Sequence, residues 1–349
     1  MPTPPTSSAP ELATPVLLIV FNRPEAARRV LAAVRLAQPA RLYVAADGPR
    51  PGRPADAALC AETRALLAAE INWPCTVQTL FREENLGCGL GPATAIDWFF
   101  RHEPEGIILE DDCLPTASFF SFCDQLLRRY RYDSRVMHIS GNNLAREARQ
   151  PAPAGADSDH FSGRVHSWGW ATWRRAWRHF DIHLTLLTEL RRRGELANIY
   201  PAWLERQYWL RKFEAVRLGP QPPHIWDYQW HFAVACNGGL TIIPAVNLVT
   251  NIGFGNAATH TFDPHDQDAH PAAHELNFPL RHPSTVLRDA RRDARHFREH
   301  LAGRAWAKVR RLLAPARPAA PSPAPATPPP PGPVMAPVAH PHPVSALSL

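Results

Sequence analysis

Short apolar runs separated by helical patterns constrain the first 140 residues more than any other feature of this chain. The runs lie at residues 16–20, 42–46, 76–81, 106–109 and 136–139. Continuous apolar runs of this length are typical of strands buried on both faces. Helical patterns lie between them, at residues 24–36, at 55–69 and in a segment ending near Phe100. This alternation predicts an α/β fold with a mostly parallel, doubly wound sheet flanked by helices.

Composition divides the 349 residues into a core and two tails. Residues 1–14 and the Ala/Pro-rich residues 314–349 are too polar or too rich in proline to form a core, so we expect both to be disordered. We expect one domain at 15–284, with a sheet half at 15–143 and a helix-rich, Trp-rich half at 144–284. Residues 145–160 and 256–283 have the composition of mobile loops. A basic helix is expected at 285–313.

Charge and cysteine usage exclude several classes of protein. The net charge is +6, but no aromatic-basic recognition motif accompanies it, so we expect no nucleic-acid partner. The six cysteines show no Cys-x-x-Cys pair, which favours reduced thiols and a cytoplasmic location. No signal peptide and no run of about 18 apolar residues is present, so no membrane-spanning helix is predicted. The basic helix could still touch an anionic membrane peripherally, although a solvated face is the simpler interpretation.

Three consecutive acids follow the apolar run at 106–109. Glu110, Asp111 and Asp112 would therefore emerge at the carboxyl end of a strand, where open α/β sheets bind ligands. Adjacent carboxylates repel one another, and hard oxygen ligands suit Mg²⁺ or Mn²⁺ bridging a diphosphate. The alternative is a solvated acidic turn, in which Asp112 lies near the amino end of a helix beginning at about Thr116.

At these residues the chain resembles a known family. The motif Ile-Leu-Glu-Asp-Asp at 108–112, followed by Leu114, Pro115, Phe119 and Phe120, is similar to the metal motif of GT-A nucleotide-diphospho-sugar transferases. The resemblance is to bacterial glycosyltransferase family 2-like proteins and to the N-acetylglucosaminyltransferase I family, and it runs from about Pro15 to Thr261. It implies a GT-A (Rossmann-like) fold with a nucleotide-sugar half at 15–143 and an acceptor half at 144–284.

The resemblance also implies roles for individual residues. Arg23, in the loop after the first strand, would approach the nucleotide, and Asp47 would hydrogen-bond the base. Asp112 would be the direct metal ligand, with Asp111 and Glu110 contacting the ribose or bound waters. The segment 167–170, which includes Trp168, resembles the lining of the sugar side.

The inverting general base of that family maps to Asp227. The chain departs from the family here, because Tyr228 stands where the eukaryotic enzymes have a second acid. It also lacks their amino-terminal membrane anchor, which puts their glycoprotein acceptor in doubt. From its neighbours alone, Asp227 is either a carboxylate with a pKa raised by bulky apolar residues or an N-capping residue of the helix at 228–235.

The tryptophans allow two interpretations. Trp168, Trp170 and Trp226 could stack on sugar faces, because an indole offers a large apolar surface at low entropic cost. Core packing is the alternative, and for Trp173 and Trp177, four residues apart on a helical pattern, we favour it.

Two further residues are candidates for donor binding. Asn142 follows the fifth strand within Gly-Asn-Asn, which fits either a close approach of ligand to backbone or a plain turn. His260 could reach the metal or the diphosphate from a closing loop, although a lone histidine is more often structural. The glycine-rich segment at 85–89 is a weak phosphate-binding signal.

Together these observations predict a metal-dependent glycosyltransferase of the hexosyl or N-acetylhexosaminyl type. It would move a sugar from a nucleoside-diphosphate sugar to a hydroxyl acceptor in bacterial glycan or surface polysaccharide synthesis. Inversion of configuration follows from the resemblance alone. A nucleotidyltransferase or diphosphate hydrolase with the same acidic strand end remains an alternative, as does a glycan-binding module without catalysis.

Overall fold

The computed structural model describes residues 12–145, 148, 150, 155–253 and 272–313. It divides into two compact units, residues 1–307 and residues 308–349. Of the segments predicted to be disordered, 1–14 and 314–349, residues 1–11 and 314–349 lie outside the described residues, as does His260. Residues 12–14 belong to the fold instead, because Leu12 and Thr14 are buried and Thr14 Oγ1 donates to Asp124 Oδ1 at 2.6 Å.

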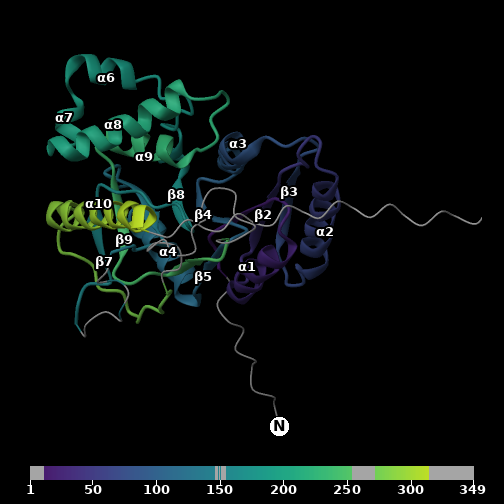
Figure 1. The fold of residues 1–349 in the computed structure, drawn as a ribbon. Helices are drawn as coiled ribbons and strands as arrows, with labels where there is room; N and C mark the ends of the chain where they lie inside the picture. The colour runs from purple at the N-terminus through teal and green to yellow at the C-terminus, as the bar shows by residue number, and fades with distance from the viewer. Residues whose placement is uncertain (1–11, 146–147, 149, 151–154, 254–271, 314–349) are drawn as a thin grey trace, which may run out of the picture. The chain divides into compact units, whose positions relative to one another are not determined.

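The centre of the fold is an eight-stranded sheet with the order β3-β2-β1-β4-β8-β6-β9-β7 (Figure 1). β3, β2, β1, β4, β6 and β9 run in one direction, and β8 and β7 run against them, so the sheet is mixed. A small antiparallel pair, β5 with β10, lies beyond the end of β4. The strands are β1 (Val16–Val20), β2 (Arg41–Ala46), β3 (Thr76–Phe81), β4 (Glu105–Glu110), β5 (Cys113–Pro115), β6 (Val136–Ser140), β7 (Asp159–Ser162), β8 (Trp170–Trp173), β9 (Leu240–Pro244) and β10 (Val249–Asn251).

Helices cover both faces of this sheet. One apolar core joins α1, α2 and α4 to one face, and a second joins α3, α5 and α9 to the other. A third, smaller cluster packs α6, α7 and α8 against the outer side of α9. The helices are α1 (Pro24–Ala37), α2 (Pro54–Glu70), α3 (Gly87–His102), α4 (Ala117–Arg129), α5 (Arg174–Trp177), α6 (Leu187–Arg193), α7 (Leu196–Ile199), α8 (Trp203–Leu218), α9 (Asp227–Cys236) and α10 (Ala290–Leu313).

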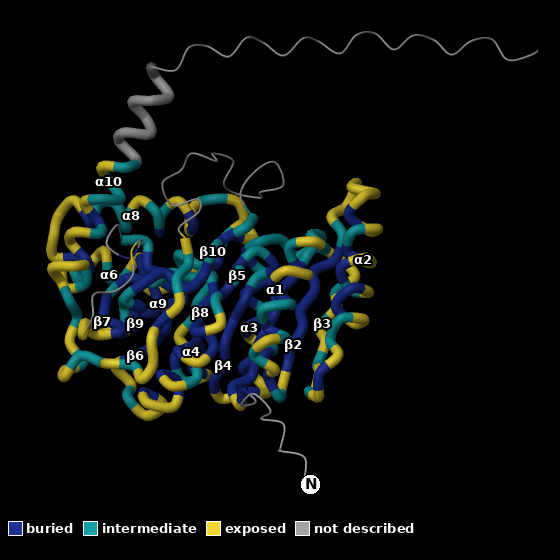
Figure 2. The backbone as a smooth tube through the Cα atoms, turned by 90° about the horizontal axis from the view of Figure 1, so that it is seen from below, coloured by how far each residue is buried: buried dark blue, intermediate teal, exposed yellow. Residues whose placement is uncertain are grey.

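The period of the strands assigns residues to the two cores. Along β1, Val16, Leu18 and Val20 belong to the first core, whereas Leu17 and Ile19 belong to the second. Because successive side chains of a strand point to opposite faces, a strand covered on both sides must be apolar throughout. All five residues of β1 are buried, and Figure 2 shows the central strands as a buried band between more exposed helices.

The elements expected from the sequence in the first 140 residues are confirmed. Each of the five apolar runs is a strand, although β4 extends one residue further at each end and so includes Glu110. The mixed character of the sheet was not apparent, because β8 and β7 lie in the Trp-rich half and run against their neighbours. The basic helix begins at Ala290.

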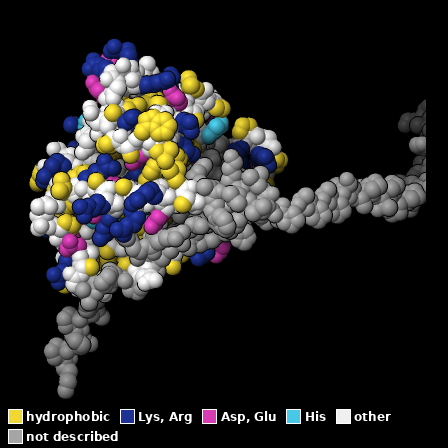
Figure 3. All heavy atoms as spheres, turned by 60° about the vertical axis from the view of Figure 1, so that its left-hand side comes forward, with side chains coloured by type: hydrophobic (Ala, Val, Ile, Leu, Met, Phe, Trp, Pro, Cys, Tyr) yellow, Lys and Arg dark blue, Asp and Glu magenta, His cyan; other side chains and the backbone are white. Residues whose placement is uncertain are grey.

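The molecular surface in Figure 3 carries apolar and basic side chains together on the side of α6, α8 and α10. Trp203, Leu204 and Leu218 of α8 are among its exposed large apolar residues. No helix within the described residues combines the length and apolar character needed to cross a membrane.

His138 in β6 lies in the second core and is a buried polar exception. Its Nδ1 accepts a hydrogen bond from Trp230 Nε1 at 3.1 Å, and its Nε2 lies 2.9 Å from the carbonyl oxygen of His166. The ring stacks on Trp170. Burial lowers the pKa of His138 to about 3, so the folded protein holds this side chain neutral.

This burial predicts loss of stability on acidification. Since the pKa of His138 is lower in the folded protein than the roughly 6.5 of an unfolded chain, its contribution is complete above that pH and is lost as the pH falls. The free energy of unfolding should drop by about 1.4 kcal/mol per pH unit for this one group below pH 6.5. Urea unfolding between pH 7 and 5 gives the slope of the free energy of unfolding against pH. In His138→Gln this slope should be smaller than in wild type by that amount. The exposed His102→Gln is the matched control, and equal slopes in the two variants would contradict the prediction.

Candidate active site

The carboxyl ends of three neighbouring parallel strands bring the predicted site residues together. β1 pairs with β2 on one side and with β4 on the other, with Ile19 opposite Glu110. The loop after β1 carries Arg23, Asp47 follows β2, and the acids end β4. These segments are far apart in the sequence, and only the strand order makes them adjacent.

Arg23 forms the closest contacts of the acidic strand end. Its Nη2 lies 2.6 Å from Asp111 Oδ1, and its Nη1 lies 2.9 Å from Asp112 Oδ2. The side chain of Asp111 is 3% exposed and that of Asp112 is 18% exposed. Asp111 also accepts a hydrogen bond from the Phe21 amide at 3.1 Å. Asp111 is thus fixed and buried, whereas Asp112 keeps a face toward solvent.

Burial and charge act against each other in this cluster. Burial raises the pKa of Asp111, and Arg23 partly offsets the increase. For Glu110, burial and the carboxylates of Asp112 and Asp111 raise the pKa, and Asp227 contributes in the same direction. Burial opposes the charge of Arg23, but the carboxylates of Asp111 and Asp112 raise its pKa overall, so it stays protonated. The effect of Asp227 on Glu110 shows that the two lie within electrostatic reach.

The side chain of Asp47 caps the amino end of α3. Its carboxylate oxygens accept hydrogen bonds from the Leu86 amide at 3.0 Å and the Gly87 amide at 3.1 Å. The first amides of a helix have no partner within the helix, and a carboxylate also suits its positive end. Asp47 therefore positions α3 in this structure, and its predicted contact with a nucleotide base stays a prediction.

A glycine brings the segment before α9 against α3. A Cβ built on Gly89 would lie 1.8 Å from the carbonyl oxygen of Pro223, so only glycine permits this approach. The contact holds the segment leading to Asp227 beside the helix that follows β3. Trp226 anchors the same segment by stacking on Trp170, with ring centroids 5.6 Å apart.

Asp227 begins α9 and lines a cavity of about 220 Å³. Asn142 and Trp168 line the same cavity, so the structure brings together three of the predicted site residues. Gly169, with φ at +63°, turns the chain between Trp168 and the buried Trp170. Asn142 is fully buried, and its Nδ2 donates to Asn247 Oδ1 and to the carbonyl of Val249.

The cavity wall is polar but largely uncharged. Burial lowers the pKa of His231 to about 3 and that of His296 to about 4, and it holds the pKa of His166 well below its usual range. Arg164 is paired with Glu205 at 2.6 Å. These histidines are neutral at pH 7. Apart from the Arg164–Glu205 pair, Asp227 is the acidic side chain of the cavity wall.

Several buried polar atoms of the cavity residues have no hydrogen-bond partner among the described residues. Such groups cost about 1–3 kcal/mol each when they stay unsatisfied. A ligand with several hydroxyl groups would satisfy both donors and acceptors of this kind. The atoms are Asn142 Oδ1, Arg164 Nε, His166 Nε2, Trp209 Nε1 and His231 Nδ1.

The tryptophan assignments need one correction. Trp170 is fully buried and Trp226 is 4% exposed, so their predicted stacking on sugar is wrong. Both fill the second core, where they stack on each other, because a large ring between β8 and α9 excludes solvent. Trp173 and Trp177 are core residues, as expected. Trp168 stays partly exposed in the cavity.

The acidic strand end fits a divalent cation held by few protein ligands. Within the part of the chain that the structure describes, no group of three His, Cys, Asp or Glu side chains is arranged to hold a metal. Mg²⁺ is commonly held by one or two carboxylates, with substrate phosphates and waters completing the shell. Asp112 suits that mode, because its side chain is partly exposed and, among the described residues, its Oδ1 accepts a hydrogen bond only from the Cys113 thiol, at 3.5 Å.

Sequence reasoning missed two contributions to the site. A Cβ built on Gly253 would lie 2.3 Å from Asp112 Oδ2, so the chain just after β10 packs directly against the acid. α10 supplies His296, Phe297 and His300 to the cavity wall. The spacing of these three on one helical face, within an otherwise basic segment, was the signal available in the sequence.

Comparisons with known proteins give distant structural similarity only. No protein family model and no curated protein matches the chain. Among solved structures, HddC from Yersinia pseudotuberculosis is 9% identical, with 46% of this chain and 77% of that chain covered and a TM-score of 0.27. Mouse xyloside xylosyltransferase 1 in its apo form is 15% identical, with 63% and 81% covered and a TM-score of 0.30. With both TM-scores below 0.5, neither match assigns the activity.

The Arg23 ion pairs predict a stability effect. Arg23→Gln leaves the buried carboxylate of Asp111 without its cation, so the free energy of unfolding at pH 8 should fall by about 3 kcal/mol, the lower end of the range for a broken buried pair because Arg23 is partly exposed. Adding Asp111→Asn should recover part of that loss. Arg28→Gln, which breaks exposed ion pairs with Glu25 and Glu70, should cost less than about 1 kcal/mol. Urea unfolding measures all three, and equal costs for the two arginine variants would exclude a structural role for the buried pair.

Proposed function

We propose that this chain is a glycosyltransferase that moves a sugar from a nucleoside-diphosphate sugar to an acceptor hydroxyl. The observation that carries the proposal is the convergence of Asp112, Arg23 and Asp227 at one edge of the sheet, beside a neutral, hydroxyl-compatible cavity. The resemblance of residues 108–112 to the GT-A metal motif supports it from the sequence. A hexosyl or N-acetylhexosaminyl donor is part of the same proposal.

The diphosphate would lie against Asp112 and Arg23. Asp112 would hold Mg²⁺ or Mn²⁺, which supplies positive charge next to the departing diphosphate. Arg23 stays protonated and its side chain is partly exposed, at 23%. Its guanidinium could therefore turn from the carboxylates to the phosphate oxygens of the donor. Asp111 and Glu110 would stay in place beneath the donor.

Asp227 would act as the general base. Its carboxylate accepts the proton of the acceptor hydroxyl while the hydroxyl oxygen bonds to the anomeric carbon. The bond between that carbon and the phosphate oxygen breaks, and the diphosphate leaves with the electron pair. Attack from the face opposite the leaving group gives inversion. Trp168 and the neutral histidines of the cavity would orient the acceptor.

Location is part of the proposal as well. We infer a bacterial, cytoplasmic enzyme of glycan or surface polysaccharide synthesis from the thiols and the resemblance. The buried thiols Cys60, Cys113 and Cys123 are free, which fits a reducing compartment. Peripheral contact of the basic helix α10 with an anionic membrane stays a prediction.

Donor binding tests the metal site. Calorimetric titration of UDP and GDP, each with and without Mn²⁺, should show metal-dependent binding of one nucleotide. Asp112→Asn should abolish it, because the direct ligand is lost, whereas Asp133→Asn after α4 should leave it unchanged. If neither nucleotide binds under any condition, the transferase proposal fails.

Transfer itself tests the base. Asp227→Asn should lower kcat by about 10²–10⁴-fold while leaving donor affinity and thermal stability close to those of wild type, since the amide keeps the shape but cannot accept the proton. Release of nucleoside diphosphate from the donor that binds measures the rate. Full activity in this variant would remove Asp227 from the mechanism, and sugar-1-phosphate as product would favour a nucleotidyltransferase or diphosphate hydrolase.

A further inference from the structure

A second concave site lies at the opposite edge of the sheet. It has a volume of about 690 Å³, within the range of small-ligand pockets. Residues before β1, at the start of β2 and β4, and at the start of α5 form it together with the end of α4. We call it the basal pocket. Glu105 and Glu110 mark the two ends of β4, about 17 Å apart at the usual rise per residue, so the basal pocket is remote from the acidic strand end.

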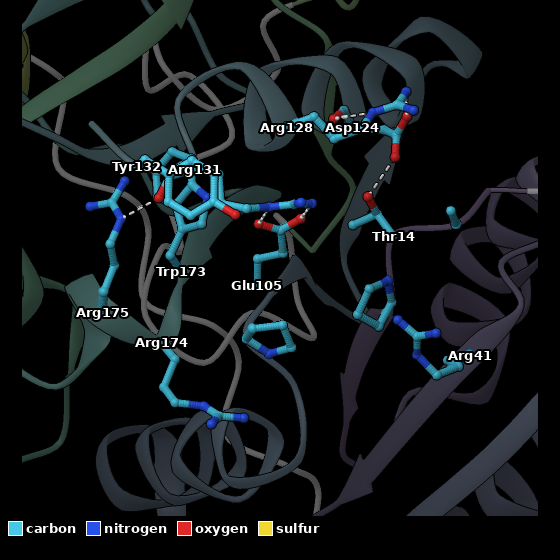
Figure 4. Close-up of a pocket in the computed structure, with 13 residues that line it drawn as sticks. Thr14, Arg41, Glu105, Asp124, Arg128, Arg131, Tyr132, Trp173, Arg174 and Arg175 are labelled. Atoms are coloured by element: carbon cyan, nitrogen blue, oxygen red, sulfur yellow. Dashed lines mark hydrogen bonds and ion pairs between the residues drawn. The ribbon is translucent and has the colours of Figure 1, made fainter. Parts of the chain in front are cut away.

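Arginines dominate the basal pocket. Figure 4 shows their side chains around it, with Arg174 and Arg175 on one side and Arg41 and Arg128 on the other. Arg131 lies between them and pairs with Glu105, with Nε 2.9 Å from Oε2.

Carboxylates neutralise only some of these arginines. Arg41 pairs with Glu103 at 2.8 Å, Arg128 pairs with Asp124, and Arg131 pairs with Glu105. Arg174 and Arg175 form no ion pair with any described residue. The basal pocket therefore carries an excess of two positive charges over the acids that pair with its arginines.

Arg174 and Arg175 are held in place by neutral groups. Arg174 Nε donates to the carbonyl of Glu103 at 3.1 Å. Arg175 donates to the carbonyls of Arg131 and Tyr130, both at 2.9 Å, and its guanidinium lies 4.3 Å from the ring centroid of Trp173. These contacts fix the cations without cancelling their charge, and each guanidinium keeps further N–H groups for an anion.

The remaining wall is apolar and open. Tyr132 is 92% exposed, and Ala13, Pro15 and Pro104 line the basal pocket. An exposed aromatic ring beside proline faces suits the C–H face of a sugar ring. Because the guanidinium groups are spread around the basal pocket, a compact anion would reach few of them, whereas an extended anion would reach several.

We propose that the basal pocket binds an acidic oligosaccharide, with its carboxylates on Arg174 and Arg175 and a sugar face on Tyr132. The inference goes beyond the proposed transfer reaction and does not rest on it, because no residue of the basal pocket belongs to the acidic strand end or to the cavity at Asp227. Such a site would hold an anionic glycan on the far side of the sheet from the reacting groups.

Calorimetry with the full chain tests the basal pocket, with tetragalacturonate, maltotetraose and inorganic phosphate as probes. Tetragalacturonate should bind at least tenfold more tightly than the neutral maltotetraose of equal length, because only it carries carboxylates for the unneutralised arginines. It should also bind at least tenfold more tightly than phosphate. Binding should weaken as salt is added. If maltotetraose bound as tightly as tetragalacturonate, the charge argument would be overturned. If phosphate bound as tightly as tetragalacturonate, the basal pocket would be a simple anion site and the oligosaccharide proposal would be overturned.

Variants locate the binding. Arg174→Gln/Arg175→Gln should lower the affinity for tetragalacturonate at least tenfold, whereas Arg29→Gln/Arg211→Gln, which removes the same charge from exposed positions on α1 and α8, should change it less than twofold. An equal loss in both would overturn the proposal. Should the first variant fail to fold, Tyr132→Ala at a fully solvated position should still lower the affinity several-fold, and an unchanged affinity would be equally decisive against it.

Asp227→Asn separates this proposal from the transfer reaction. Tetragalacturonate should bind this variant as tightly as wild type, because the basal pocket shares no residue with the cavity. Loss of binding in Asp227→Asn would place the oligosaccharide in the cavity and overturn the proposal, whatever the fate of the transferase activity.

Discussion

The ion pairs of Arg23 with Asp111 and Asp112 are the constraint on which the candidate site depends. Three consecutive acids at the end of a buried strand would be costly alone, because burial disfavours their charged forms and their charges repel. Arg23 supplies the compensating cation from the loop that follows the neighbouring strand β1. The parallel pairing of β1 and β4 therefore places the charges of the site as well as burying the apolar side chains of the two strands.

That arrangement leaves Asp112 and Asp111 in different states. Asp111 is buried beneath Arg23 and holds the loop after β1 through the Phe21 amide. Asp112 shares the same cation but keeps solvent exposure, although the backbone at Gly253 packs against its Oδ2 side. Adjacent residues of one motif thus divide into a structural acid and an accessible acid. The division follows from the turn after β4, which places successive side chains in different surroundings.

Much of the fold could be predicted from the sequence because its signals are local. A run such as residues 16–20 can be buried on both faces only as a strand in a covered sheet, and the chain between such runs has helical periodicity. The antiparallel strand β8 was not predicted, because the pattern around Trp170 and Trp173 resembled that of ligand-binding or helical tryptophans. Their burial depends on α9 and α4, which are distant in the sequence, and no local pattern reports such packing.

The site shows the same distinction between local and distant information. The three acids could be predicted as site residues from the sequence, because they directly follow an apolar strand. No such sign of the cavity at Asp227 appears in the sequence, because its wall combines residues from the loop after β6, the Trp-rich segment and α10, which only the tertiary fold assembles. His166, His231 and His296 illustrate the difficulty, since a histidine in a sequence carries no sign of whether it is charged. Burial makes these three neutral, and the chemistry of the cavity follows from that burial more than from residue identity.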